Sequence, residues 1–586
     1  MGTHNRIAPT SDLTTVFRPR PGLYEFGLSS ALLLLVLFVF FHNLGGAALF
    51  EPDEGRNAEV AREILATGDW VTPHYDFVPR LDKPIPYYWA VALCYKLFGV
   101  SEWSARFPSA VAALACVLLT SALALTIFGF WEALWSGLIL TTGVEFFVLA
   151  RTVILDMTLA FFLTLALCAF YWAATRSRAL PKRRLYLLMY LAIGVAALLK
   201  GPIGIILPAL VILSYGFHTR KWFLLNEMHL ISGAALSLVL ASSWYLWAEM
   251  KNPGYLRYFF LEENILRFLT ADVGHSQPGY YFFAVLSIGF LPWTLLLTLV
   301  VRDCWERPLD DATVFLANWV VVPLLFFSLS NSKLPHYVLP VYPPLSIIAG
   351  RSLHRILRDP RATRGWVLSL PWVTLAAAFL VFLVALLKPD ALPHPIVDRV
   401  GQFGTAVSFP VLWVGFLIPI LLASVHWPMF WKRPAMLYLS YCLGFFLSFL
   451  IAHRVVAEAS RTRTSKALAE HIAPLIDSED RLVVFHAYPS SLPFYLQIER
   501  PLWVVWSGKR GPVLGSRYVG AKLPLSAVRH EQVLFTYEQF SRLWRESRER
   551  ILVLIRSKDL ERLSQEGVTP VKTVAESGDV VLVTNR

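Results

Sequence analysis

A short segment near the amino terminus combines residue types that could do chemistry. Glu51, Asp53 and Glu54 place three carboxylates in four positions, directly after a long apolar run. Charge at a membrane boundary is costly unless it is solvated or paired, so it marks a functional candidate by default. A carboxylate in such a place could accept a proton during catalysis. The simpler alternative is that Asp53 or Glu54 caps a helix that begins near residue 56.

A second candidate segment runs from residue 80 to residue 89. Asp82 and Lys83 stand beside Pro84, and an aromatic stretch follows. A lysine here could neutralise negative charge that develops in a reaction. The alternative is an interfacial aromatic belt whose lysine extends toward the lipid headgroups.

The elements that position these residues must be largely membrane helices. Of 586 residues, 56% are hydrophobic and 16% are charged, whereas about 25% are charged in an ordinary soluble protein. The apolar surplus must face lipid, which excludes a cytosolic enzyme, a disordered chain and a fibrous repeat. Charged residues make up about 26% of residues 455–586 and about 13% of the residues before them. We therefore expect a membrane domain at 1–454, including a loop at 44–103, and a water-soluble domain at 455–586.

Apolar runs of a length that can cross about 30 Å of hydrocarbon define the membrane domain. The long runs are 26–43, 104–127, 132–150, 155–175, 229–249, 280–301, 312–331, 367–387, 408–426 and 435–452, and the shorter ones are 184–199, 202–217 and 336–350. The net charge of +12 lies mostly in basic clusters between these runs, such as 176–184 and 351–364. This is typical of cytoplasmic loops rather than of a nucleic-acid-binding protein.

The basic clusters also predict the topology. All of them are cytoplasmic if 84–99 is a helix on the outer membrane surface and not a span. This arrangement predicts about thirteen transmembrane helices, a cytoplasmic amino terminus and an external carboxy-terminal domain. The candidate residues outside that domain would then face one external cavity.

The carboxy-terminal domain should be a small α/β domain. Apolar runs at 482–485, 502–505, 551–555 and 580–583 predict buried strands, and 458–474 and 538–550 predict helices. It has no glycine-rich phosphate loop and no nucleophile elbow. We expect it to cap the membrane domain or to contact the acceptor.

The order of motifs resembles that of the bacterial aminoarabinose lipid A transferases. These are GT-C enzymes that use polyprenyl-phosphate sugars and are related to the protein O-mannosyltransferases. The matching motifs are Glu51-Pro52-Asp53-Glu54-x-Arg56, Lys83-Pro84, Leu155-Asp156, Lys200-Gly201, Glu263 to Phe268, and Lys333-Leu334-Pro335-His336-Tyr337. The resemblance implies a polytopic α-helical GT-C fold in the bacterial inner membrane and a periplasmic active site. It also implies an undecaprenyl-phosphate-linked sugar donor, aminoarabinose or a related sugar, with lipid A as acceptor, and a role in lipopolysaccharide modification and polymyxin resistance.

The candidate residues suit transfer of a sugar from such a donor. The leaving phosphate needs fixed cations, and a carboxylate is needed as a base or to stabilise an oxocarbenium-like sugar. We expect Asp53 and Asp156 to be catalytic, and Asp53 to point into the cavity because Pro52 restrains the backbone before it, whereas Glu54 and Glu59 would face water. The residues expected to bind the donor phosphate are Arg56, Lys83, Lys200, Arg267, Lys333 and Tyr337. No nucleotide cofactor is expected, because the isoprenoid carries the sugar.

The resemblance also implies one divalent metal ion. The positions concerned are Asp82, Glu263, Asn264 and His275. Relatives have a glutamate where this chain has Asp82, and the aminoarabinose transferases have a histidine at Asn264. Oxygen ligands of this kind suit magnesium or calcium.

Other function classes share some of these features. A secondary transporter should show inverted repeats and charges near mid-membrane, and neither is evident. A lipid-phosphate flippase or scaffold would share the phosphate site but would not need paired aspartates. A protein O-mannosyltransferase-like enzyme, or a transferase that acts on another envelope glycan, would share the chemistry and differ in its acceptor.

Overall fold

The computed structural model describes most of the chain. The residues that it does not describe are 1–21, 176–180, 270–276, 359–437, 439–443, 445–464, 478, 486–487, 506–513, 515, 517, 520–532, 566–567, 569–570 and 578–579.

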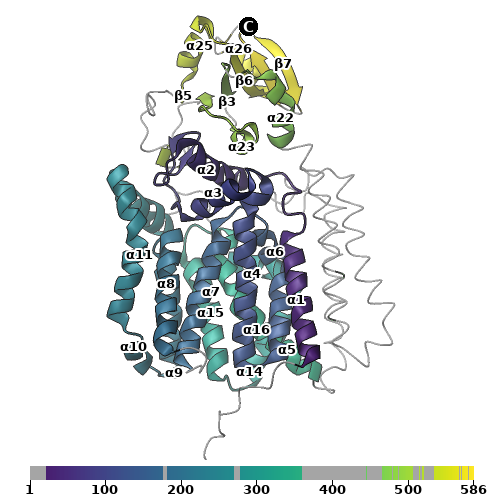
Figure 1. Cartoon of the computed structure of the whole chain (residues 1–586), viewed down its shortest axis with the longest axis vertical. Helices are drawn as coiled ribbons and strands as arrows, with labels where there is room; N and C mark the ends of the chain where they lie inside the picture. Colours follow the sequence, from purple (N-terminus) through teal and green to yellow (C-terminus); the bar gives the residue numbers. More distant parts are fainter. Residues whose placement is uncertain are drawn as a thin grey trace, which may run out of the picture.

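The membrane part is a bundle of helices that stand side by side (Figure 1). The longer helices are α1 (Leu23–Phe41), α4 (Glu102–Ile127), α5 (Phe130–Thr142), α7 (Leu155–Ala174), α8 (Lys182–Lys200), α9 (Ile203–Thr219), α11 (Leu230–Lys251), α15 (Asp311–Leu329) and α16 (Tyr342–Arg358). The shorter ones are α6 (Val144–Ala150), α10 (Phe223–Glu227), α13 (Tyr281–Gly289) and α14 (Leu296–Glu306). Within the described residues, five helices are long and apolar enough to cross a membrane, or six if α5 and α6 form one bent span. The chain is therefore a multi-pass membrane protein.

Each predicted apolar run that falls among the described residues is helical, but some are interrupted. The run 132–150 bends by 67° between α5 and α6, where the Val144 N–H donates to the Leu291 carbonyl at 2.9 Å. The run 280–301 is split into α13 and α14. The runs 367–387, 408–426 and 435–452 lie almost wholly outside the described residues, so the total number of spans stays a prediction.

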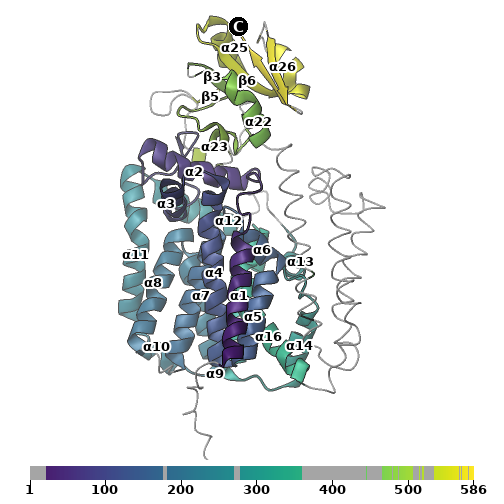
Figure 2. The ribbon, with the colours of Figure 1, turned by 45° about the vertical axis from the view of Figure 1, so that its right-hand side comes forward.

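Two helices lie across one end of the bundle, α2 (Asp53–Thr67) and α3 (Pro86–Phe98) (Figures 1 and 2). Helix α3 has proline at its first position, which suits a residue without an N–H group. Its 13 residues span about 20 Å, less than the hydrocarbon core. Leu93 and Leu97 on its outer face are exposed, while Tyr88 and Tyr95 are buried. The segment 84–99 thus forms a surface helix, as its sequence predicted.

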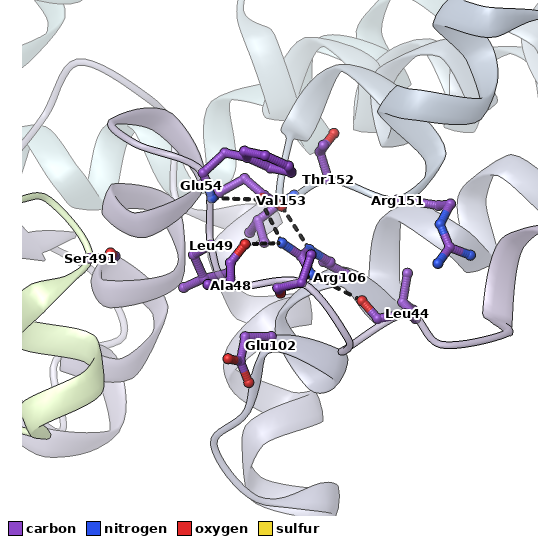
Figure 3. A network of polar contacts seen from close by, with 12 residues as sticks. Leu44, Ala48, Leu49, Glu54, Glu102, Arg106, Arg151, Thr152, Val153 and Ser491 are labelled. Carbon is purple, nitrogen blue, oxygen red and sulfur yellow. Dashed lines mark hydrogen bonds and ion pairs between the residues drawn. The ribbon is translucent and has the colours of Figure 1, made fainter. Parts of the chain in front are cut away.

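A buried ion pair holds the loop between α1 and α2 (Figure 3). Arg106 of α4 is 1% exposed, and its Nε and Nη2 atoms donate to Glu54 at 2.9 and 2.8 Å. The same guanidinium donates to the carbonyls of Leu44, Ala47 and Ala48 at 3.0, 2.7 and 3.0 Å. These carbonyls lie in a loop, so Arg106 satisfies backbone acceptors that no helix or strand would pair.

The prediction that Glu54 and Glu59 face water is wrong. Glu54 is buried and also accepts hydrogen bonds from the N–H groups of Phe50 and Val153 at 3.0 and 2.8 Å. Glu59 is fully buried and accepts two hydrogen bonds from Arg62, both at 2.7 Å. Buried carboxylates of this kind are tolerated because a cation and several donors pair with them.

The carboxy-terminal part contains a six-stranded sheet. Its strands are β3 (Arg481–Phe485), β4 (Trp503–Val505), β5 (Leu534–Phe535), β6 (Ile551–Arg556), β7 (Lys572–Ser577) and β8 (Val580–Thr584), in the order β5-β4-β3-β6-β8-β7. Strands β5, β4, β3 and β6 run parallel to one another, and β8 runs antiparallel to both of its neighbours, β6 and β7. The helices are α22 (Ser465–Ile472), α23 (Leu492–Leu496), α25 (Tyr537–Glu546) and α26 (Leu560–Gln565). The four strands predicted from apolar runs are present as β3, β4, β6 and β8.

This sheet region lies above α2 and α3 (Figure 1), and the segment beside it is hydrogen-bonded to α2 and to the loop before α2. Glu51 accepts from the N–H groups of Ser490 and Ser491, both at 2.8 Å. Arg62 of α2 donates to the Ile498 carbonyl at 2.7 Å. Contacts from the amino-terminal loop thus fix the sheet region over one end of the bundle.

Candidate active site

A cavity beneath α2 and α3 gathers many of the predicted site residues. Those that line it are Asp82, Lys83, Lys200, Glu263, Asn264, Arg267 and Tyr337. Its other walls include the rings of Phe259, Phe268, Phe326 and Phe327. The volume is about 70 Å³, which at roughly 10–15 Å³ per water holds about five to seven waters, or a group of phosphate size.

Lys83 and Arg267 approach the same carboxylate from two elements. The Lys83 Nζ lies 3.7 Å from Glu263 Oε1. Glu263 belongs to the π-helix η2 (Arg257–Leu266), and Arg267 follows in the short helix α12 (Arg267–Leu269), so Arg267 also pairs with Glu263. The pKa of Lys83 is lowered to about 8, chiefly by burial; the charge of Glu263 opposes this shift, and the charges of Arg267 and Lys200 contribute to it. The cluster of positive charges formed by Lys83, Lys200 and Arg267 favours the binding of an anionic ligand.

Asp156 is held by groups from two other elements. It is the second residue of α7, and Lys200 is the last residue of α8. Lys200 donates to Asp156, and His336 Nε2 lies 3.7 Å from Asp156 Oδ2. The Lys200 Nζ is also 4.6 Å from the centroid of the Tyr337 ring, within cation–π range. Asp156 is thus a paired carboxylate that orients Lys200.

A glycine makes the position of Lys200 possible. Gly201 ends α8 with φ at 74°, a left-handed conformation that favours glycine. A Cβ atom at this position would lie 2.9 Å from the ring of Phe259. The close approach of Phe259 brings the aromatic wall of the cavity next to Lys200.

Asp53 is the accessible one of the two predicted catalytic carboxylates. It is the first residue of α2, its side chain is 82% exposed, and it pairs with Arg56 at 2.7 Å. Pro52 occupies the N-cap position, and no side chain makes a capping bond there, so the capping alternative does not describe this structure. Asp53 lies close enough to His336 for their charges to interact. It therefore stands on the same side as the cavity without lining it.

Other predicted site residues lie outside the cavity wall. Arg56 is largely buried beside Asp53, and burial lowers its pKa, with a further lowering by Arg80. Lys333 is 7% exposed and donates to the Gln277 carbonyl at 3.0 Å. The neighbouring Ser332 does line the cavity, 3.5 Å from Arg267. His275 lies outside the described residues.

Two tyrosines near Asp82 were not anticipated from the sequence. Tyr258 donates its hydroxyl to Asp82 Oδ1 at 2.7 Å, and the backbone N–H of Tyr518 donates to the same oxygen at 3.3 Å. Arg80 Nε lies 3.6 Å from Asp82 Oδ2. Burial opposes ionisation of Asp82, but Arg80 and the hydrogen bonds outweigh it, so the pKa of Asp82 lies below its ordinary value. Asp82 thus ties η2 and the carboxy-terminal part to the loop that carries Lys83.

Of the residues predicted to hold a divalent ion, the three that the structure describes, Asp82, Glu263 and Asn264, do not form a site for one among themselves. Within the described part of the chain, no three His, Cys, Asp or Glu side chains form a metal-binding group. Asp82 faces Arg80, and Glu263 faces Lys83 and Arg267. These cations would repel a metal ion. The side-chain amide of Asn264 donates to the Phe259 carbonyl at 2.7 Å.

Known proteins resemble this chain over most of its length. Residues 82–247 match the family described as dolichyl-phosphate-mannose-protein mannosyltransferase. The chain is 32% identical, over 378 residues, to the undecaprenyl phosphate-alpha-4-amino-4-deoxy-L-arabinose arabinosyl transferase of Enterobacter sp. (strain 638), covering 63% of this chain and 66% of that protein. It is 34% identical over 364 residues to the protein of the same name from Pseudomonas paraeruginosa, with 60% and 65% covered. The chain thus spans just under two thirds of the length of these curated relatives.

Solved structures extend the likeness to nearly the whole chain. The crystal structure of ArnT from Cupriavidus metallidurans bound to undecaprenyl phosphate has a TM-score of 0.81 and 27% identity, and covers 96% of this chain and 98% of that one. The apo state of the same protein gives 0.79 and 28%. The chain is similar in sequence to the aminoarabinose transferases over more than half of its length, and in fold to ArnT over nearly all of it. The resemblance predicted from motifs in residues 26–350 is confirmed, and the fold shared with ArnT reaches well beyond them.

Proposed function

We propose that the protein is a membrane glycosyltransferase that moves 4-amino-4-deoxy-L-arabinose from undecaprenyl phosphate to lipid A. The observation that carries the proposal is the cavity in which Lys83, Lys200 and Arg267 converge beside an aromatic wall. Fixed cations suit the phosphate, whose negative charge grows as the sugar leaves. The phenylalanine rings suit the isoprenoid. The similarity to the aminoarabinose transferases and the undecaprenyl phosphate named for the ArnT crystal structure support the same donor.

The residues of this chain can be given roles in the transfer. Lys83 and Arg267 hold the donor phosphate, and Glu263 keeps both side chains oriented toward it. Lys200 is held by Asp156 at the other side of the cavity. The cavity accommodates the phosphate alone, so the sugar lies outside it, on the side of Asp53. A carboxylate there stabilises positive charge on the sugar ring as the bond to the phosphate breaks.

The acceptor decides whether a base is needed. A phosphate of lipid A is already ionised near neutral pH, so it can attack the sugar without losing a proton. Asp53 then acts as an electrostatic stabiliser. A hydroxyl acceptor would require a base, and the match of residues 82–247 to the mannosyltransferase family favours transfer to a protein hydroxyl as the second candidate.

The topology is part of the proposal. The basic clusters place the end of the bundle that carries α2 and α3 outside the cytoplasm, together with the carboxy-terminal domain. The active site would then face the periplasm, with about thirteen helices in the inner membrane. A topology reporter fused after residue 586 should be active only in the periplasm. Activity of a cytoplasm-specific reporter at that position would contradict the orientation.

Mass spectrometry of envelope components tests the function. Lipid A and surface proteins are compared between cells with the protein, cells without it, and cells with the Lys83→Ala variant. We expect aminoarabinose on lipid A only with the intact protein. A sugar found instead on surface proteins would favour the second candidate. No change in either fraction at normal expression would contradict transferase activity.

A further inference from the structure

Helices α14 and α16 lie toward the end of the bundle opposite α2 and α3 (Figure 2). Two adjoining hollows are lined by residues of α14, α15 and α16. The first is polar, has a volume of about 300 Å³, and includes Asp303, Arg307, Arg351 and Arg355 in its lining. The second is apolar and has a volume of about 460 Å³. Cys304 and Ile348 belong to both. A polar and an apolar compartment therefore share one wall.

The arginines of the polar hollow are incompletely neutralised. Arg307 Nε lies 3.6 Å from Asp303 Oδ1, and Arg355 Nη1 lies 3.7 Å from Asp303 Oδ2. These distances exceed the 2.7–2.9 Å or so of a hydrogen-bonded ion pair. Among the described residues neither arginine has a closer acidic partner, and their side chains remain 55% and 33% exposed. Both can therefore donate to a further anion.

Arg351 forms part of the wall of the polar hollow. It pairs with Asp310 and lies 3.9 Å above the ring of Phe128. Its exposed fraction is 15%, so it is a fixed part of the wall. Within the part of the chain that the structure describes, Arg307, Arg351 and Arg355 pair with two carboxylates, those of Asp303 and Asp310, which leaves one positive charge unbalanced among these residues.

The apolar hollow is open on one side to the surface of the described bundle. Val300, Val320 and Leu345 line it, and Val301 and Trp305 at its edge are 62% and 88% exposed. An exposed tryptophan beside arginines is typical of the level of the lipid headgroups. Basic pockets between membrane helices at this level bind anionic lipid headgroups.

We infer that this hollow binds an anionic phospholipid. The phosphate lies between Arg307 and Arg355, where it balances the excess charge, and one acyl chain lies along the apolar groove. The site is at the opposite end of the bundle from Lys83, so it is separate from the donor site and does not depend on the proposed function. A zwitterionic lipid would fit the groove but would leave the charge unbalanced.

Lipid nanodiscs containing the full purified chain test this inference. One set holds phosphatidylcholine alone and another holds phosphatidylcholine with phosphatidylglycerol. The thermal midpoint and the lipid retained in native mass spectrometry are measured for the parent, Arg307→Gln, Arg355→Gln and Arg302→Gln. Arg302→Gln is the matched control. Arg302 lies on α14, the helix that ends just before Arg307; it is exposed, pairs with Glu306 and lines neither hollow.

Phosphatidylglycerol should raise the thermal midpoint of the parent and of Arg302→Gln and stay bound to both. Both effects should be largely lost in Arg307→Gln and Arg355→Gln. Ala317→Phe, which fills the apolar groove without changing charge, should also reduce lipid retention. Equal stabilisation of all variants would overturn the inference. Equal stabilisation by inorganic phosphate in phosphatidylcholine nanodiscs would show that the lipid chain plays no part, and would also overturn it.

Discussion

The low pKa of Lys83 gives the proposed mechanism a pH dependence that can be measured. In the free protein, burial brings this pKa to about 8. The charged lysine binds the donor phosphate and exists below that pH. As the pH rises through about 8 the charge is lost, and kcat/KM for the donor should fall. Bound phosphate favours the charged lysine, so the fall in kcat should come at a higher pH than the fall in kcat/KM.

The size of the effect follows from the contact that is lost. A hydrogen bond from a charged group contributes about 1.5–3 kcal/mol, which corresponds to roughly a 10- to 150-fold change in kcat/KM. Lys83→Ala should show a loss of this size at neutral pH. Lys83→Arg keeps a charge that does not titrate, so it should lose the alkaline fall. Its activity at neutral pH should still be below the parent, because a planar guanidinium does not replace a compact ammonium.

Initial rates with labelled donor in proteoliposomes, measured from about pH 6 to about pH 11, give the comparison, since this range brackets both the shifted and the ordinary lysine pKa. Lys96→Arg is the matched control, because Lys96 is an exposed lysine in the last turn of α3. It should keep the parent profile. An alkaline fall that is the same in Lys83→Arg and in the parent would refute the assignment of the pKa to Lys83.

Four further substitutions separate the roles of the other residues. Asp53→Asn should reduce turnover roughly a hundredfold at unchanged thermal stability, because Asp53 is exposed and makes no capping bond; turnover within a few-fold of the parent would remove it from the mechanism. Glu54→Gln should cost about 3–5 kcal/mol of stability, because it leaves Arg106 buried without its counter-ion; an unchanged thermal midpoint would show that the pair does not anchor the loop. Lys200→Ala should weaken donor binding more than Lys333→Ala in a donor titration, because Lys200 lines the cavity and Lys333 does not; equal losses would place the phosphate elsewhere.

Features carried by one stretch of sequence could be predicted. The apolar runs marked the helices of the bundle, and the positions of the basic clusters favoured a surface helix over a span at 84–99. The alternation of apolar runs and turns located β3, β4, β6 and β8. The cavity residues Lys83, Lys200 and Arg267 were predicted because they lie in the motifs that carry the resemblance and on the side of the membrane that the basic clusters predict to be external.

Features that depend on distant partners could not be predicted. Arg106 lies 52 positions from Glu54, and Tyr518 lies 436 positions from Asp82. Hydrophobic periodicity reports which face of an element is buried, but not which polar group meets it there. For this reason Glu54 was expected in water although it is an anchor, and the ion pair of Asp82 with Arg80 was not foreseen.

Transfer by the purified protein is the decisive measurement of the proposed function. The chain is reconstituted in proteoliposomes with undecaprenyl phosphate-linked aminoarabinose and lipid A, and both lipids are followed by mass spectrometry. The proposed transfer predicts that aminoarabinose appears on lipid A as undecaprenyl phosphate is released, and that Lys83→Ala at matched reconstitution is far slower. Donor that binds but is never consumed, with lipid A unchanged, would contradict it and would favour a lipid-phosphate flippase or scaffold.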